Sequence, residues 1–176
     1  MSAIFERRSV RDFLSRPVEA DKIERILRAG FEAPSAHNRR PWEFLVISGR
    51  EDLEALSRMS PYAKMCAKAA AAVAACVNLK LGESKDEDHN AWWIQDLSAA
   101  TENMLLQIVD EGLGGVWLGW YPDQGRVKAF SERFGLPAHL LPFSLIALGY
   151  PAGPPGKRDR FDAAKVHYEY YGRTKN

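Results

Sequence analysis

The stretch WWIQDLSAATENMLLQIVDEGLGGVWLGWY, residues 92–121, decides the fold. Polar residues recur in it at seven-residue steps: Asp96, Asn103 and Asp110. Apolar residues fill so much of the remaining circumference that we predict a helix over 92–112 that is buried on more than one side. In a chain this small, the second buried side indicates a partner subunit. The glycines at the end of this helix predict a turn into a strand over 116–121.

The sequence on either side alternates between helical and strand patterns. Helices are expected over 21–30, 51–59 and 124–134, the first with a capping box formed by Asp21 and Glu24. Buried strands are expected over 42–48 and 141–150, whereas the alanine-rich segment 68–79 fits helix or strand and is interpreted as a strand. This alternation predicts a layered α/β or α+β domain, and the proline-rich segment 151–160 predicts an extended arm.

Length and composition restrict the function classes. A chain of 176 residues predicts one domain, and 24 Lys and Arg against 23 Asp and Glu leave a net charge of +1. This balance speaks against nucleic acid and an anionic membrane as partners. Two cysteines are too few for a disulfide framework or a four-thiolate metal site, and no metal is predicted. The N-terminus has no apolar signal region and no apolar run is long enough to span a bilayer, so we expect a cytoplasmic protein.

Two basic clusters stand out in this nearly neutral chain. RRSVR, residues 7–11, and GKRDRFD, residues 156–162, each bring three cationic side chains together. Either cluster alone would usually be exposed surface. One guanidinium group can bind two phosphate oxygens at once, and a serine hydroxyl adds a further hydrogen bond. The two clusters therefore indicate one shared anion, such as a phosphomonoester.

Two further segments suit a flat heterocycle. In APSAHNRRPW, residues 33–42, Asn38 offers both a donor and an acceptor, although a plain turn before a strand explains the segment equally well. In GLGGVWLGW, residues 112–120, a helix cap explains the first glycines but not Gly119, which leaves backbone uncovered inside an apolar strand. The sequence contains no GxSxG, HExxH, P-loop or GxGxxG motif, so no catalytic side chain is assigned.

The order RRSVRDF, APSAHNRRPWEF, the long helix with GLGGVWLGWYP, and IALGYPAGPPGKRDRFD resembles the nitroreductase family of FMN-dependent oxidoreductases in its compact form. The similarity runs from about Arg7 to Val166. It implies an α+β sandwich with a mixed, mainly antiparallel central sheet flanked by helices. It also implies an intertwined homodimer with two FMN sites at the interface, in which residues 151–176 form an arm that reaches the neighbouring subunit.

The resemblance carries cofactor-binding roles onto specific positions. The N-terminal segment would contact the phosphate, the ribityl chain and the pyrimidine side of the ring, and a C-terminal pair would contact the phosphate. A loop from the other subunit and a backbone stretch near N5 and O4 would complete the site. In that order, these residues are Arg7, Arg8, Ser9 and Arg11; Arg158 and Arg160; Pro34, Ser35 and Asn38; and Val116, Trp117, Leu118 and Gly119. Arg40 departs from the family, which usually has Gln before Pro-Trp.

The chemistry that the resemblance implies belongs to the cofactor. NADH or NADPH would deliver hydride to flavin N5 and leave, and a nitroaromatic, a quinone or an activated alkene would then be reduced on the same ring face, giving ping-pong kinetics. Other activities of such proteins are flavin fragmentation, reductive dehalogenation and azoline oxidation. A flavin-binding module that stores or senses FMN without turnover is the alternative from a different class.

Overall fold

The computed structural model describes residues 2–82, 92–154, 156 and 158–174. Its centre is a four-stranded sheet of β1 (Trp42–Ile47), β2 (Ala71–Asn78), β3 (Gly114–Gly119) and β4 (Leu140–Gly149). The strand order is β1-β2-β4-β3, and every neighbouring pair is antiparallel. The helices are α1 (Ala3–Glu6), α2 (Ala20–Phe31), α3 (Arg50–Met59), α4 (Leu79–Gly82), α5 (Trp92–Asp110) and α6 (Gln124–Phe134), with 3-10 turns at Ala36–Asn38, Lys64–Lys68 and Ala163–Lys165.

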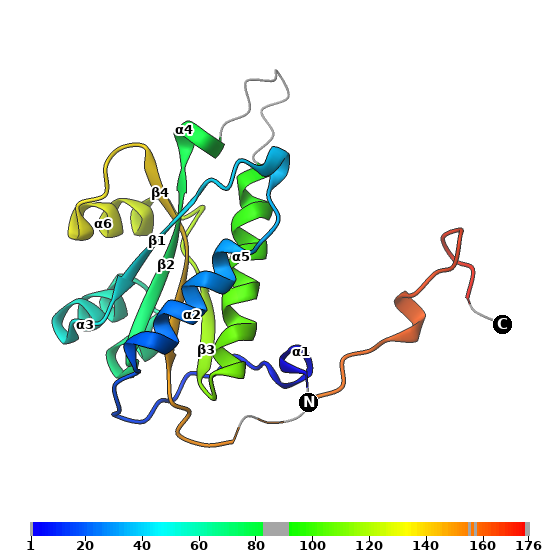
Figure 1. Ribbon diagram of the computed structural model, residues 1–176, viewed down its shortest axis with the longest axis horizontal. Helices are drawn as coiled ribbons and strands as arrows, with labels where there is room; N and C mark the ends of the chain where they lie inside the picture. The colour runs from blue at the N-terminus through cyan, green and yellow to red at the C-terminus, as the bar shows by residue number, and fades with distance from the viewer. Residues whose placement is uncertain (1, 83–91, 155, 157, 175–176) are drawn as a thin grey trace.

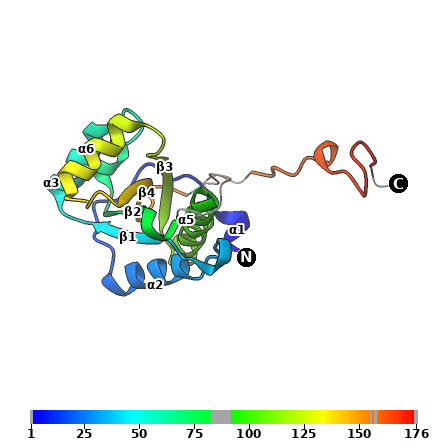
Figure 2. The ribbon, with the colours of Figure 1, turned by 90° about the horizontal axis from the view of Figure 1, so that it is seen from above.

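Helices cover both faces of the sheet. Helices α2 and α5 lie on one face, and α3 and α6 lie on the other (Figures 1 and 2). Successive side chains of a strand point to opposite faces. Accordingly, Val73 and Val77 of β2 enter the core under α2 and α5, whereas Ala74 and Cys76 enter the core under α3 and α6. Because β2 is buried on both faces, its sequence is almost wholly apolar.

Helix α5 packs along the sheet with the face that the sequence predicted. Trp93, Leu97, Ala100, Met104 and Ile108 are all buried in the core that α5 shares with α2. The apolar residues on its second side are less uniformly buried: Leu105 is buried, whereas Ile94 and Val109 are only partly buried. Within one chain, α5 is therefore fully covered on one side and partly covered on the other.

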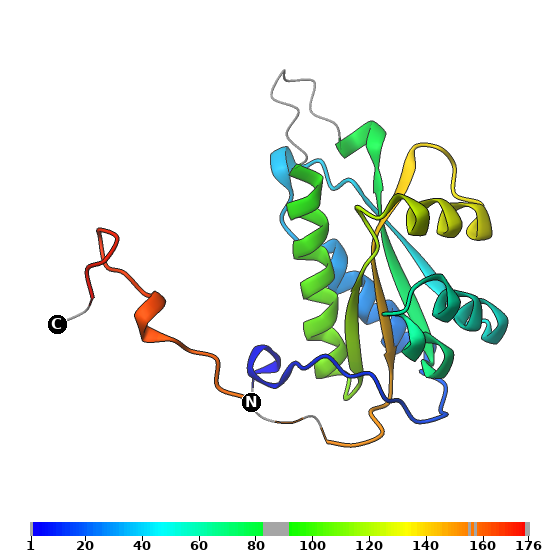
Figure 3. The same ribbon diagram turned by 180° about the vertical axis from the view of Figure 1, so that it is seen from behind.

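The edge strand β3 is joined to the N-terminal segment. Ser9 forms a parallel bridge with Gly115, and the N–H of Val10 donates to the carbonyl of Gly115 at 3.0 Å. A Cβ atom on Gly114 would lie 2.7 Å from the side chain of Val10, so this close approach requires glycine. Phe13 bridges Pro151 in the same region. The start of the chain and the segment after β4 are thus held together at one edge of the sheet (Figure 3).

The predicted elements are confirmed with one correction. The capping box is wrong: α2 begins at Ala20 with Glu19 as its N-cap residue, and Asp21 instead accepts a hydrogen bond from Arg25 one turn later. The predicted mainly antiparallel sheet is confirmed, and among the described residues its parallel component is the Ser9–Gly115 bridge. Within the segment 68–79, residues Ala71–Asn78 form the strand β2, and residues 161–174 extend away from the body of the protein (Figure 1). None of the helices over 2–82 and 92–174 is long and apolar enough to cross a membrane.

Candidate functional site

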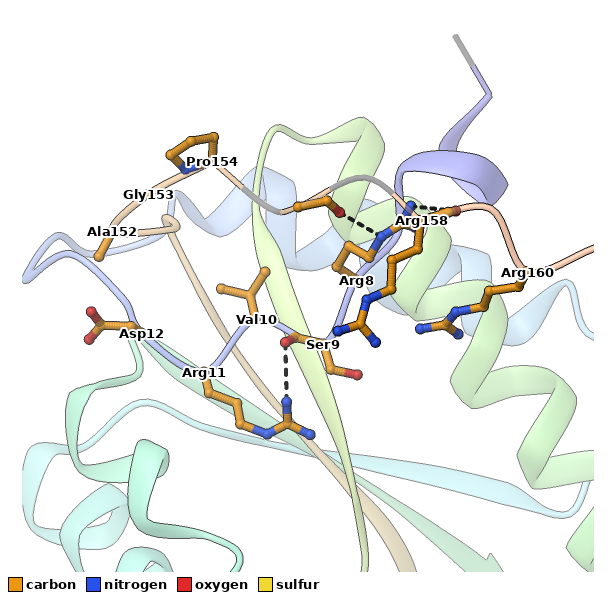
Figure 4. Close-up of a pocket in the computed structure, with 11 residues that line it drawn as sticks. Arg8, Ser9, Val10, Arg11, Asp12, Ala152, Gly153, Pro154, Arg158 and Arg160 are labelled. Atoms are coloured by element: carbon orange, nitrogen blue, oxygen red, sulfur yellow. Dashed lines mark hydrogen bonds between the residues drawn. The ribbon is translucent and has the colours of Figure 1, made fainter.

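The two basic clusters line one groove. Residues 8–12 form one wall and residues between 152 and 160 form the other, enclosing about 700 Å³ (Figure 4). The lining residues are Arg8, Ser9, Val10, Arg11, Asp12, Ala152, Gly153, Pro154, Gly156, Arg158 and Arg160. Figure 4 shows the guanidinium groups of Arg158 and Arg160 extending in the same direction, towards Ser9. Segments 150 residues apart in sequence therefore meet as predicted; Lys157 lies outside the described residues.

Arg8 ties the two walls together. Its Nε donates to the carbonyl of Gly156 at 2.8 Å, and its Nη2 donates to the carbonyl of Arg158 at 3.2 Å. Its Nη1 also donates to the carbonyls of Phe5 and Arg7. The guanidinium of Arg8 thus holds the C-terminal segment against the N-terminal segment. Its positive charge lies in the wall of the groove, where an anion would bind.

The other cations of the N-terminal cluster differ in their surroundings. Arg7 forms an ion pair with Glu102 of α5, with 3.0 Å between Nε and Oε1. Its side chain lines an adjoining recess with Phe5 and Phe161 rather than the groove itself. Arg11 donates to the carbonyl of Ser9 at 3.3 Å and does line the groove. The role predicted for Arg7 at the cofactor stays a prediction, because its charge is partly compensated by Glu102.

The backbone of β3 continues from this groove along the open edge of the sheet. The carbonyl of Gly115 points away from β4, because it accepts a hydrogen bond from Val10. Along a strand, the backbone N–H and C=O groups of every second residue point to the same side. The N–H groups of Trp117 and Gly119 therefore face the open edge of the sheet. Val116 and Leu118 are buried, whereas Gly119 is exposed. A Cβ atom at Gly119 would meet nothing within 4 Å. The packing of the protein itself therefore does not require glycine at position 119. A ligand that lies against the backbone would require it, because a side chain would occupy the ligand's space.

The loop that carries Pro34, Ser35 and Asn38 lies elsewhere. Its Ala36 N–H donates to the Asp96 carboxylate near the start of α5 at 2.8 Å. The N-terminal segment instead runs past the start of β3, towards the other end of α5 (Figures 1 and 3). None of residues 34–38 lines the groove. In one chain the structure brings the two basic clusters and β3 together but leaves this loop apart, as expected if the loop serves a second subunit.

The same loop holds an unusual backbone. His37, Asn38 and Arg40 all have positive φ values, of 53°, 54° and 45°. Such conformations cost energy in residues other than glycine and cluster at functional sites. The Oγ of Ser35 accepts from the N–H of Arg40 at 2.9 Å and helps to hold them. The arrangement leaves Asn38 and Arg40 exposed.

Two residues of the region were not found from the sequence. Asp96 is only 7% exposed, and burial raises its pKa. Its seven-residue spacing from Asn103 and Asp110 indicates an outward face, so this spacing does not predict burial. Arg126 lies beside β3, where its Nη1 donates to the carbonyl of Gly119 at 2.8 Å. That contact crosses the turn between β3 and α6, and no motif signals it.

The residues fit a phosphorylated aromatic cofactor better than a metal. The groove offers guanidinium groups for a phosphate, and the strand edge offers amide donors beside open space for a ring. Across the described ranges, no cluster of three or more His, Cys, Asp or Glu side chains could hold a metal ion. Cys66 and Cys76 are free, and burial raises the pKa of each thiol to about 12. Both thiols are therefore protonated at neutral pH and unsuited to nucleophilic chemistry.

Comparisons with known proteins agree with this picture. The model of the nitroreductase family matches residues 4–83 and 68–150. A Methanothermobacter thermautotrophicus protein, named as a candidate NADH dehydrogenase/NAD(P)H nitroreductase, is 41% identical over 96% of this chain and 86% of its own length. The structure of a candidate NADH oxidase from Clostridium acetobutylicum is 40% identical, with a TM-score of 0.89 over 97% of this chain and 100% of that one. A candidate nitroreductase from Desulfovibrio desulfuricans, solved in complex with FMN, is 29% identical, with a TM-score of 0.77 over 96% and 95% of the two chains.

Proposed function

Because this chain belongs to the nitroreductase family, we propose that it is an oxidoreductase that binds FMN and uses NAD(P)H to reduce nitroaromatics, quinones or activated alkenes in a ping-pong reaction. Residues 1–176 would act as one domain, with an arm from residue 151, in the reducing cytoplasm where free buried thiols persist. The observation that carries the proposal is the continuity between the arginine-lined groove and the open edge of β3.

Arg158, Arg160 and Ser9 would hold the cofactor phosphate in the groove, while Arg8 keeps its two walls together. From Gly115 to Gly119 the strand spans four residue steps, roughly 13 Å, so one extended molecule could reach from the groove to Gly119. The outward N–H groups of Trp117 and Gly119 would then face the ring. Bound FMN would supply the hydride-transfer chemistry between the nicotinamide and the second substrate, while these residues hold and orient it.

A second copy of the chain would complete the site with Pro34, Ser35 and Asn38. The separation of this loop from the groove supports that arrangement, because both sets cannot serve one ligand within one chain. Two exposed aromatic residues support it as well: Phe5 and Phe161 are each 77% exposed and line the same recess. Contiguous exposed apolar patches mark interaction sites. We therefore propose a homodimer in which each site takes residues from both subunits.

Initial-velocity measurements with FMN-loaded protein test the proposed reaction. NADH or NADPH is varied at several fixed concentrations of a quinone and, separately, of a nitroarene. Parallel double-reciprocal lines with one of the two nucleotides would support the ping-pong scheme. Intersecting lines would contradict that scheme, and the absence of nucleotide oxidation with both classes of acceptor would favour a module that only binds flavin.

A further inference from the structure

The end of β3 is braced by one arginine. The Nη1 of Arg126, on the first turn of α6, donates to the carbonyl of Gly119 at 2.8 Å. The side chain of Arg126 is 25% exposed. Gly119 is also the residue beside which the structure leaves space that no side chain of this chain fills. A positive charge is thus placed one hydrogen bond away from the backbone at which the flavin ring is expected.

The surroundings hold this arrangement rigidly. The indole Nε1 of Trp120 donates to the carbonyl of Arg126 at 2.9 Å, and the backbone N–H of Trp120 donates to Phe143 at 3.0 Å. On the other side, Ser144 lies opposite Gly119 in the β3–β4 register. Its hydroxyl is hydrogen-bonded to that of Thr101 at 2.9 Å in the core. α6 therefore cannot move away from the end of β3 without breaking the hydrogen bonds that Arg126 and Trp120 form between them.

One carboxylate partly compensates the charge. Asp123 is the N-cap residue of α6, and its Oδ2 lies 2.9 Å from Nη2 of Arg126. Its Oδ1 accepts from the backbone N–H of Arg126, and this hydrogen bond, together with the guanidinium, lowers the pKa of Asp123. Asp123 is therefore ionised at neutral pH. The guanidinium of Arg126 contacts the carbonyl of Gly119, and the carboxylate of Asp123 lies on the far side of that guanidinium. The positive potential at Gly119 is therefore reduced, but not cancelled, by Asp123.

We propose that Arg126 raises the reduction potential of the flavin, by placing its guanidinium on the carbonyl of Gly119 beside the ring. The proposal rests on the proposed function, since it requires FMN along the edge of β3. Reduction adds negative charge to a flavin, so a nearby positive charge favours the reduced form. Arg126 does not touch the substrate in this account and acts only through the field and the backbone that it holds.

The test is the midpoint potential of bound FMN, measured by anaerobic reductive titration against an indicator dye. Arg126→Gln removes the cation and keeps a hydrogen-bond donor, and we expect the equilibrium constant for reduction to fall about tenfold, about 30 mV for a two-electron couple. Asp123→Asn keeps the cap but removes the compensating anion, and we expect the potential to rise. Mere structural damage would not shift the potential in opposite directions in these two variants.

Lys128→Gln is the matched control. Lys128 is an exposed cation of the same helix, paired with Glu132 at 3.8 Å. We expect this variant to keep the wild-type potential. If the wild type binds FMN and is reduced, but both Arg126→Gln and Asp123→Asn keep its potential or shift it in the same direction, the inference is overturned while the proposed function stands. If the wild type fails to bind FMN, both are overturned.

Discussion

The carboxylate of Asp96 lies 2.8 Å from the backbone nitrogen of Ala36 and accepts its hydrogen bond. This contact joins helix α5 to the loop in which His37, Asn38 and Arg40 adopt positive φ values. The carboxylate is nearly buried, and the loss of hydration raises its pKa above that of an exposed aspartate. Asp96 therefore holds a strained, exposed loop at the cost of keeping a carboxylate away from water.

The first prediction concerns the pH dependence of stability. Because the folded protein binds the Asp96 proton more tightly than the unfolded chain does, this group makes stability fall as pH rises. The fall begins near the ordinary aspartate pKa of about 3.9 and ends once the raised pKa is passed. Asp96→Asn removes this contribution while its amide oxygen still accepts from Ala36. Urea unfolding at pH 4 to 8 should show the variant gaining stability relative to wild type as pH rises.

A matched variant separates charge from hydrogen bonding. Asp96→Leu also removes the charge but leaves the Ala36 N–H without its acceptor, and we expect a loss of about 1–3 kcal/mol in the free energy of unfolding. If wild type and Asp96→Asn showed identical pH profiles of unfolding free energy, burial of the ionised carboxylate would not destabilise the protein, and the prediction would be wrong.

The second prediction concerns Gly119. Since a Cβ atom there meets nothing within 4 Å, Gly119→Ala should leave the free energy of unfolding within about 0.5 kcal/mol of wild type. The same methyl group would occupy the space expected for the ring, so we expect at least a tenfold loss of FMN affinity by fluorescence titration. Undiminished FMN affinity in Gly119→Ala would place the ring elsewhere.

The third prediction concerns the groove. Arg158→Gln and Arg160→Gln should each weaken FMN binding about tenfold, as expected for the loss of one charge-assisted hydrogen bond. Riboflavin lacks the phosphate, so its affinity should hardly change, and the FMN-to-riboflavin affinity ratio should fall in both variants. Arg28→Gln, which removes an exposed cation paired with Glu24 on α2, should keep the wild-type ratio. Equal losses for both ligands would argue against a phosphate site in the groove.

The fourth prediction tests whether each site draws on two subunits. Asn38→Ala and Arg158→Gln should both impair homodimers. In a mixed dimer of the two variants, one site would combine the intact groove of the first chain with the intact loop of the second. Co-expressed chains with different tags should therefore recover up to half of the wild-type activity per dimer. Mixed dimers as inactive as the two homodimers would contradict the shared site.

Much of the fold could be predicted because its local signals are strong. The alanines and valines of β2 are buried on both faces, and Trp92–Asp110 forms the long helix that its periodicity predicts. The order of the strands could not be predicted, because hydrophobic periodicity shows which residues are buried but not which strands pair. The N-cap of α2 is Glu19, two residues before the predicted Asp21, because Asp21 and Glu24 pair with Arg25 and Arg28 instead of capping the helix.

The site was predicted where residue type alone carries the chemistry. Arginines at positions 8, 158 and 160 meet at one groove as their charges suggested. Asp96 and Arg126 could not be predicted, because each acts through a hydrogen bond to a backbone group. Asp96 binds the N–H of Ala36, which is distant in sequence, and Arg126 binds the carbonyl of Gly119 across a turn. A carboxylate on a helix and an arginine after a strand are common surface features, and only their contacts distinguish these two.

The most direct test of the proposed function is the visible spectrum of the purified, FMN-loaded protein under anaerobic conditions. The account predicts that NADH or NADPH bleaches the flavin absorbance and that a quinone or a nitroarene restores it. Flavin that stays oxidised with both nucleotides, or protein that fails to retain FMN, would contradict it.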